Sequence, residues 1–271
     1  MAILQQVRTE DFFERHPVFS LDEAAGALLP PRGRAGTVER LKYHLAKGRL
    51  KRVSREIYAV VPRGMSADTF QPDVFLAAFT VRPEAVFSHH SALELLGVAH
   101  SVWNRCTVYC APRRSSLAVG SNAVLFLDHP APFRMSGDFL FGTRQVERLG
   151  RLLRVTGPER TLVECFRRLD LAGGVAELVE SAGGFPTLDL ALLESVLERH
   201  GLSSLWAATG WFLEAHQKTF HVPDALLHRL ESHRPKAPQY LVRRLRGGTL
   251  AARWNLILPP GLEHLGEPDE R

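Results

Sequence analysis

The apolar positions of this 271-residue chain change their spacing between residues 9 and 62. They recur three and four positions apart in TEDFFERHP, FSLDEAAGALL and TVERLKYHLAKG, which is the spacing of one helical face. After Gly48 the sequence becomes basic and β-branched with a period near two, in RLKRV and EIYAVVP. The pattern therefore predicts three helices and then a β-hairpin that turns at Ser54 and Arg55.

Capping residues indicate where these helices begin and end. Ser20 is followed three residues later by Glu23, which forms a capping box for the second helix. Pro30 and Pro31 end that helix, and Gly48 is the expected C-cap of the third. Helix, helix, turn, helix and hairpin is the element order of a winged helix-turn-helix, so we predict this fold for residues 1–64.

The third predicted helix has an apolar face and a basic face. Val38, Leu41 and Leu45 lie within about 60° of one another on a helical wheel, so we expect them to be buried. The opposite side carries Arg40, Tyr43 and Lys47, with Thr37 and His44 flanking them. The bland alternative is an ordinary amphipathic helix with a solvated basic face.

Charge distribution favours a nucleic-acid partner. Between Arg32 and Arg63 there are ten Lys and Arg residues against two acidic ones, a net charge of +8, which leaves −3 for the rest of the +5 chain. Such a local excess is typical of a module that meets phosphates. We therefore predict that the third helix and the hairpin bind double-stranded DNA through Arg32, Arg34, Thr37, Arg40, Tyr43, His44, Lys47, Arg49, Lys51, Arg52 and Arg55.

The remaining residues, 65–271, predict a larger mixed α/β domain, which makes the chain an α+β protein. Residues 62–72 have the composition of a connection. Helices are expected in DVFLAAFTV, SHHSALELLGV, PERTLVECFRRL, GVAELVESAG, LDLALLESVLERHG, SSLWAATGWFLEAHQ and PDALLHRLESH, and strands in RCTVYCAP, NAVLFLDHP, LRVT, QYLVRRL and ARWNLILP. Gly247 and Gly248 are the expected hairpin turn between the last two strands.

Neither polar cluster of the larger domain predicts a metal site or an active site. His89 and His90 are adjacent, so on a helix they point about 100° apart, unlike the i, i+4 pair that binds zinc. Glu159, Arg160 and Glu164, with Arg168, have the spacing of salt bridges on a solvated helix face. The chain also lacks a Gly-rich phosphate loop and a nucleophile elbow, so we predict a protein that is not an enzyme and uses no metal or cofactor.

The expected location is the cytoplasm. The three cysteines, Cys106, Cys110 and Cys165, are an odd number without metal-ligand or redox spacing, which fits a reducing compartment. Charge, Gly or Pro interrupts every apolar stretch within about ten residues, so no membrane span or signal peptide is predicted.

Four stretches in the same order resemble the AbiEi-type antitoxins of the abortive-infection AbiE systems, which are type IV toxin-antitoxin modules. They are LKYHLAKGRLKRVSREIYAVVP, FSHHSALELLGVAH, LRVTGPERTLVECF and the tryptophan strand RWNLILP. The resemblance implies a winged helix that represses its own operon by binding operator DNA. It also implies a larger domain that counteracts a nucleotidyltransferase-like toxin, without requiring stable binding of the toxin.

Two other readings of the chain stay open at this point. One is a stand-alone winged-helix transcriptional regulator with a ligand-sensing domain, and the other is a DNA-processing enzyme with a winged-helix targeting module. For an antitoxin, the expected working surface of the larger domain is a basic helix and strand, VERLGRLLRV, together with YLVRRLRGG. Its candidate partner-binding residues are Arg148, Arg151, Arg154, Arg243, Arg244 and Arg246.

Overall fold

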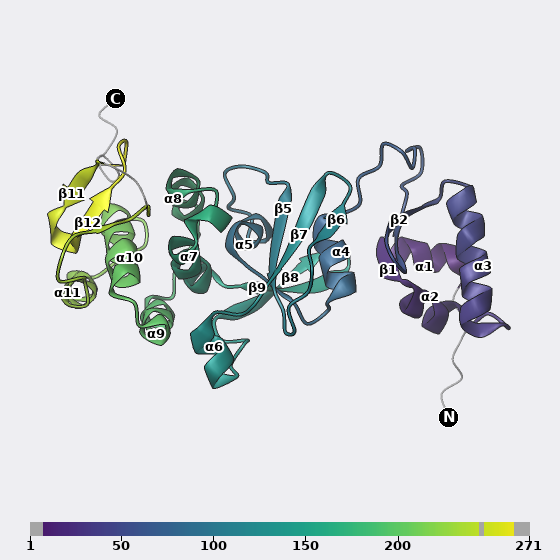
Figure 1. Ribbon diagram of the computed structural model, residues 1–271, viewed down its shortest axis with the longest axis horizontal. Helices are drawn as coiled ribbons and strands as arrows, with labels where there is room; N and C mark the ends of the chain where they lie inside the picture. The colour runs from purple at the N-terminus through teal and green to yellow at the C-terminus, as the bar shows by residue number, and fades with distance from the viewer. Residues whose placement is uncertain (1–7, 244–246, 263–271) are drawn as a thin grey trace. The chain divides into compact units, whose positions relative to one another are not determined.

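The computed structural model describes residues 8–243 and 247–262 (Figure 1). The protein is α+β, as predicted, and its helices and strands form two compact units. The first unit contains the chain up to Phe87 together with residues 103–128 and 145–154, and the second contains residues 88–102, 129–144 and the chain from Val155 onward. The division therefore does not coincide with the boundary expected near residue 64.

The N-terminal part of the first unit contains three helices and a three-stranded antiparallel sheet of order β1-β3-β2. Its elements are α1 (Thr9–Arg15), β1 (Val18–Ser20), α2 (Leu21–Leu28), α3 (Gly33–Ala46), β2 (Leu50–Ser54) and β3 (Ile57–Val60). The predicted capping box is present, because the Ser20 hydroxyl accepts from Glu23 N and the Glu23 carboxylate accepts from Ser20 N. This is the element order predicted for residues 1–64, with β1 added.

Aromatic residues form the core of this N-terminal part. The rings of Phe12 and Phe19 meet edge to face at 5.0 Å between centroids, and Phe13 stacks on Phe19 at 5.7 Å. Strand β1 was not predicted, because a strand of three residues between two helices is too short to show a period of two. The predicted hairpin is confirmed, although Ser54 belongs to β2 and the turn includes Glu56, whose φ is +62°.

A six-stranded mixed sheet of order β6-β7-β5-β4-β9-β8 follows. Strands β5 and β7 run parallel, while β4 with β5 and β6 with β7 are antiparallel. The apolar helix α4 (Val74–Val81) packs on β5 and β7. The strands are β4 (Val86–Phe87), β5 (Arg105–Tyr109), β6 (Leu117–Val119), β7 (Asn122–Leu127), β8 (Thr143–Arg148) and β9 (Arg151–Thr156).

The second unit is mainly helical. Its core gathers apolar residues of α7 to α11, and a small sheet of order β10-β12-β11 lies beside α10 (Figure 1). Its elements are α5 (His89–Leu95), α6 (Ala131–Ser136), α7 (Pro158–Arg167), η1 (Leu169–Leu171), α8 (Val175–Gly183), α9 (Leu190–His200), α10 (Ser203–Ala215), α11 (Asp224–Ser232), β10 (Gln239–Tyr240), β11 (Thr249–Ala251), η2 (Ala252–Trp254) and β12 (Leu256–Leu258).

Two local predictions for the larger domain are wrong. The segment VERLGRLLRV is not a helix and a strand but parts of strands β8 and β9, joined by Leu149 and Gly150 with φ of +48° and +80°. Positive φ at both turn positions is what a tight two-residue hairpin turn requires. Gly247 and Gly248 do not join two antiparallel strands, because β10 runs parallel to β12 and the antiparallel partner of β12 is β11.

The expectation of a solvated charge cluster on α7 is also wrong. All residues from Pro158 to Phe166 are buried, because other helices of the second unit surround α7. Arg160 and Glu164 are 0% and 1% exposed, and Arg160 Nε donates to Glu164 Oε1 at 2.8 Å. Arg160 Nη1 donates to the backbone oxygens of Phe139 and Phe141 at 3.0 and 2.8 Å.

Replacing Glu164 by Gln should lower the free energy of unfolding by about 3 kcal/mol or more, because a buried guanidinium loses its compensating charge while side-chain shape is kept. Chemical denaturation of the whole chain measures this. Asp170→Asn is the matched control, since Asp170 also pairs with an arginine, Arg168, but at the surface. Its loss should stay below about 1 kcal/mol, and equally small losses in both variants would show that water reaches the Arg160 pair.

Candidate nucleic-acid interface

Helix α3 is held by its apolar face, as the sequence predicts. Leu41 is buried in the aromatic core of the N-terminal part, and Val38 and Leu45 are partly buried against the same core. Strand β2 follows α3 after Gly48, whose φ of +66° suits a glycine at the end of a helix. The opposite face of α3 is thereby presented outward.

Three residues of the outward face of α3 lie in one row. Arg40, Tyr43 and Lys47 are spaced three and four positions apart, so they lie on the same side of the helix. Tyr43 is 59% exposed, and Lys47 Nζ lies 6.0 Å from the centroid of its ring. Lys47 is exposed and Arg40 is partly exposed. Two cations and a phenol are thus available to a ligand that approaches α3.

Thr37 and His44, which we expected beside this row, are core residues. Thr37 is fully buried and its hydroxyl donates to Gly33 O at 3.2 Å. The ring of His44 packs edge-on against Phe13 at 5.0 Å, and burial, followed by the charge of Arg49, lowers the pKa of His44. Both side chains are therefore buried, and neither belongs to the exposed face of α3.

Three of the expected basic residues have partners within the first unit. Arg34 pairs with Asp22 and, at 2.9 Å, with Glu56. Arg49 pairs with Glu10, and this hydrogen bond lowers the pKa of the Glu10 carboxyl. Lys51 Nζ donates to Phe70 O at 2.7 Å, which ties the hairpin to the connection after residue 62. Acidic side chains inside the protein therefore compensate the charges of Arg34 and Arg49, and Lys51 serves a structural contact.

The remaining residues of the predicted set form what we call the α3–hairpin face. Its members are exposed or partly exposed, and none has a carboxylate within salt-bridge distance among the residues that the structure describes. They are Arg32, Arg40, Tyr43, Lys47, Arg52 and Arg55. Arg52 Nε donates to Ser54 O at 3.2 Å, which supports the end of the hairpin. This surface can bind phosphate oxygens and base edges.

The second predicted surface, that of the partner-binding arginines, is divided. Arg148 pairs with Asp73 at 2.7 Å, and Arg151 pairs with Glu23 at 2.8 Å. Arg154 is partly exposed on β9 and Arg243 is exposed after β10, in the other compact unit. Arg244 and Arg246 lie outside the described residues. Arg148 and Arg151 therefore make contacts inside the first unit. The described arginines of the predicted surface belong to different strands and to different units.

The paired histidines are structural in the second unit. His90 lies with Nδ1 at 3.0 Å from Glu94 Oε1 and with Nε2 at 3.2 Å from Glu177 Oε1, so it links α5 to α8. His89 is also buried. Across the described ranges no group of three or more His, Cys, Asp or Glu could hold a metal ion. Within the same ranges no helix is long and apolar enough to cross a membrane.

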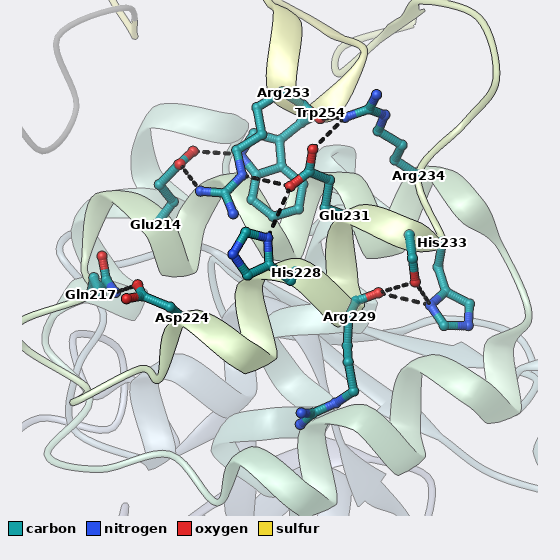
Figure 2. Close-up of polar contacts among 11 residues, drawn as sticks. Glu214, Gln217, Asp224, His228, Arg229, Glu231, His233, Arg234, Arg253 and Trp254 are labelled. Atoms are coloured by element: carbon teal, nitrogen blue, oxygen red, sulfur yellow. Dashed lines mark hydrogen bonds and ion pairs between the residues drawn. The ribbon is translucent and has the colours of Figure 1, made fainter.

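Arg253 and Trp254 lie in the 3-10 turn η2 rather than in the predicted strand, which begins only at Leu256, and a polar cluster that sequence reasoning missed holds them in place (Figure 2). Arg253 lies between two carboxylates and donates to Glu214 Oε1 at 2.6 Å and to Glu231 Oε2 at 3.0 Å. Trp254 Nε1 donates to Glu214 Oε2 at 2.5 Å, and a Cβ on Gly210 would lie 2.1 Å from the indole ring. The cluster thus anchors a buried indole on α10, and its charges compensate one another.

No family model matches the chain, and no curated protein matches it. Among solved structures, the chain is similar to the crystal structure of the RV2827C protein from Mycobacterium tuberculosis, with a TM-score of 0.61. The match covers 93% of this chain and 90% of that chain at 17% sequence identity. At this identity the similarity concerns the fold, which the two chains share over nearly their whole length.

The two faces of α3 should respond differently to truncation. Leu41→Ala should lower the free energy of unfolding by about 2–5 kcal/mol, because it leaves a cavity in the aromatic core. Tyr43→Ala should change it by less than about 0.5 kcal/mol, because the ring is mostly exposed. Denaturant unfolding of both variants measures the difference, and similar losses would mean that the orientation of α3 is wrong.

Proposed function

We propose that this chain binds double-stranded operator DNA through the α3–hairpin face. The observation that carries the proposal is the sorting of charge in the N-terminal part. Arg34 and Arg49 have acidic partners inside the protein, whereas the cations of the α3–hairpin face have none among the described residues. Uncompensated cations on the exposed face of a helix and a hairpin fit a polyanion better than they fit a core or a small ligand.

The dimensions of α3 suit the major groove of DNA. Its 14 residues span about 21 Å, and the groove is about 12 Å wide. Arg40 and Lys47 are separated by two helical turns, or about 10 Å, with Tyr43 between them. In this arrangement Arg40 reads base edges while Tyr43 and Lys47 hold phosphates. Arg55 at the tip of the β2–β3 hairpin then reaches the flanking backbone or the minor groove.

We further propose that the protein is the antitoxin of a type IV toxin-antitoxin module. In this role it represses its own operon and counteracts a nucleotidyltransferase-like toxin in the cytoplasm. The four stretches that resemble AbiEi-type antitoxins support the proposal, and two of them now have structural roles. His90 of the histidine pair links α5 to α8, and the stretch RWNLILP contributes Trp254, which is anchored on α10. In this proposal, elements outside the α3–hairpin face neutralise the toxin.

Binding to its own upstream DNA should weaken steeply with salt, because each neutralised phosphate releases counterions. Arg40→Ala should cost about 1–3 kcal/mol of specific binding, and Lys47→Ala should reduce the salt slope by about one unit. Fluorescence anisotropy with labelled duplex at several salt concentrations measures both. Arg229→Ala is the matched control, since Arg229 is an exposed arginine of α11 that pairs with Glu194. The proposal fails if the control and Arg40→Ala bind equally well.

Repression and neutralisation should separate in one variant. The full chain with Arg40→Ala and Lys47→Ala should lose repression of an operon reporter yet still rescue growth when a neighbouring nucleotidyltransferase-like toxin gene is expressed. Both substitutions lie on exposed or partly exposed positions, so the fold is retained. Rescue by neither this variant nor the unchanged chain would favour a stand-alone transcriptional regulator, and loss of rescue in the variant alone would tie neutralisation to DNA binding.

A further inference from the structure

A hollow of about 280 Å³ lies in the second unit at the end of α7. The last turn of α7, the 3-10 turn η1 and residues 241–243 form its walls. Phe166 and Leu241 supply apolar surface, and Arg167, Arg168 and Arg243 supply three guanidinium groups. The hollow belongs to neither the α3–hairpin face nor the polar cluster around Arg253.

Two of these three guanidinium groups are not compensated. Arg168 is held by Asp170, with Nε to Oδ1 at 2.9 Å and Nη2 to Oδ2 at 2.7 Å. Arg167 and Arg243 are exposed, and no carboxylate of the described ranges lies within salt-bridge distance of either. The hollow therefore presents two free positive charges beside an apolar wall.

A strained, buried histidine lies within reach of the same charges. His89 is 2% exposed and has a φ of +54°, which a side-chain-bearing residue rarely adopts. Burial first, and then the charge of Arg168, lowers the pKa of His89 to about 3, so its ring is neutral at physiological pH. Backbone strain of this kind is often found at ligand sites. The charged residues that act on His89 thus include three that line the hollow, Arg167, Arg168 and Asp170.

We propose that this hollow binds a nucleoside monophosphate, with Arg167 and Arg243 on the phosphate and the wall formed by Phe166 and Leu241 against the base. The planar guanidinium fork matches two phosphate oxygens, and an apolar wall suits a flat base. The volume is near the lower end of small-ligand pockets, which run from roughly 300 to 1,000 Å³. A mononucleotide fits that space, and a folded segment of a protein partner does not.

Calorimetric titration of the full chain with AMP, GMP, CMP and UMP, each separately at low salt, tests the proposal. Saturable binding of at least one of them with a 1:1 stoichiometry is expected. Arg167→Gln and Arg243→Gln should each weaken that binding at least about tenfold, because each removes a charge-assisted hydrogen bond to phosphate. Arg229→Gln removes the same charge from an exposed position outside the hollow and should leave the affinity unchanged.

Three results would overturn the proposal. They are no saturation by any of the four nucleotides, equal weakening in Arg229→Gln, and inorganic phosphate that binds as tightly as the best nucleotide. Unchanged melting temperatures of the variants show that the exposed substitutions leave the fold intact. The inference does not rest on the proposed function, because the hollow contains no residue of the α3–hairpin face. Operator binding by Arg167→Gln and Arg243→Gln should therefore equal that of the unchanged chain.

Discussion

The packing of the second unit depends on the buried positive charge of Arg160. The guanidinium of Arg160 is fully buried, and its charge is balanced by Glu164 one helical turn further along α7. Its Nη1 donates to the backbone oxygens of Phe139 and Phe141, and the guanidinium carbon lies 3.9 Å from the centroid of the Phe133 ring. An unpaired buried charge costs several kcal/mol. The chain around residues 133–141 and α7 therefore have to be in place together.

The same need for compensation determines what the N-terminal part displays. Arg34 and Arg49 are drawn into pairs with Asp22 and Glu10, and Lys51 is drawn to a backbone oxygen. These pairs are partly exposed, so each contributes little to stability. Their larger effect is on the surface, because they remove charge beside α3 and leave Arg40 and Lys47 as a distinct row around Tyr43. That row defines which side of α3 faces the DNA in the proposed complex.

Anchoring by single large side chains is a second theme of the fold. Trp254 is 1% exposed and packs on Gly210, where the absence of a Cβ makes room for the indole. Glu214 accepts from the indole nitrogen and also from Arg253, so one carboxylate orients both residues. His90 acts similarly between Glu94 and Glu177. In each case a buried polar atom meets a specific partner, as burial requires.

Local pattern alone predicted much of this protein. Apolar spacing placed α2, α3 and the β2–β3 hairpin, and the Ser20 capping box marked the start of α2. The buried face of α3 followed from Leu41 and its neighbours, and the α+β class followed from the mixture of periods. These features depend on interactions between residues within one or two turns of each other, so a short stretch of sequence is enough to predict them.

Tertiary contacts decided the rest. Arg160 and Glu164 have the spacing of a solvated pair, and only the helices packed around α7 make them core residues. His44 lies at the edge of a helical face, and its burial depends on the ring of Phe13, which comes from another helix. Arg34 pairs with Asp22, 12 positions away, whereas Arg151 pairs with Glu23, 128 positions away, and Trp254 pairs with Glu214, 40 positions away. Burial and ion pairing depend on which residues pack against a side chain in the folded protein. The spacing of residues along the sequence does not show which distant residues those are.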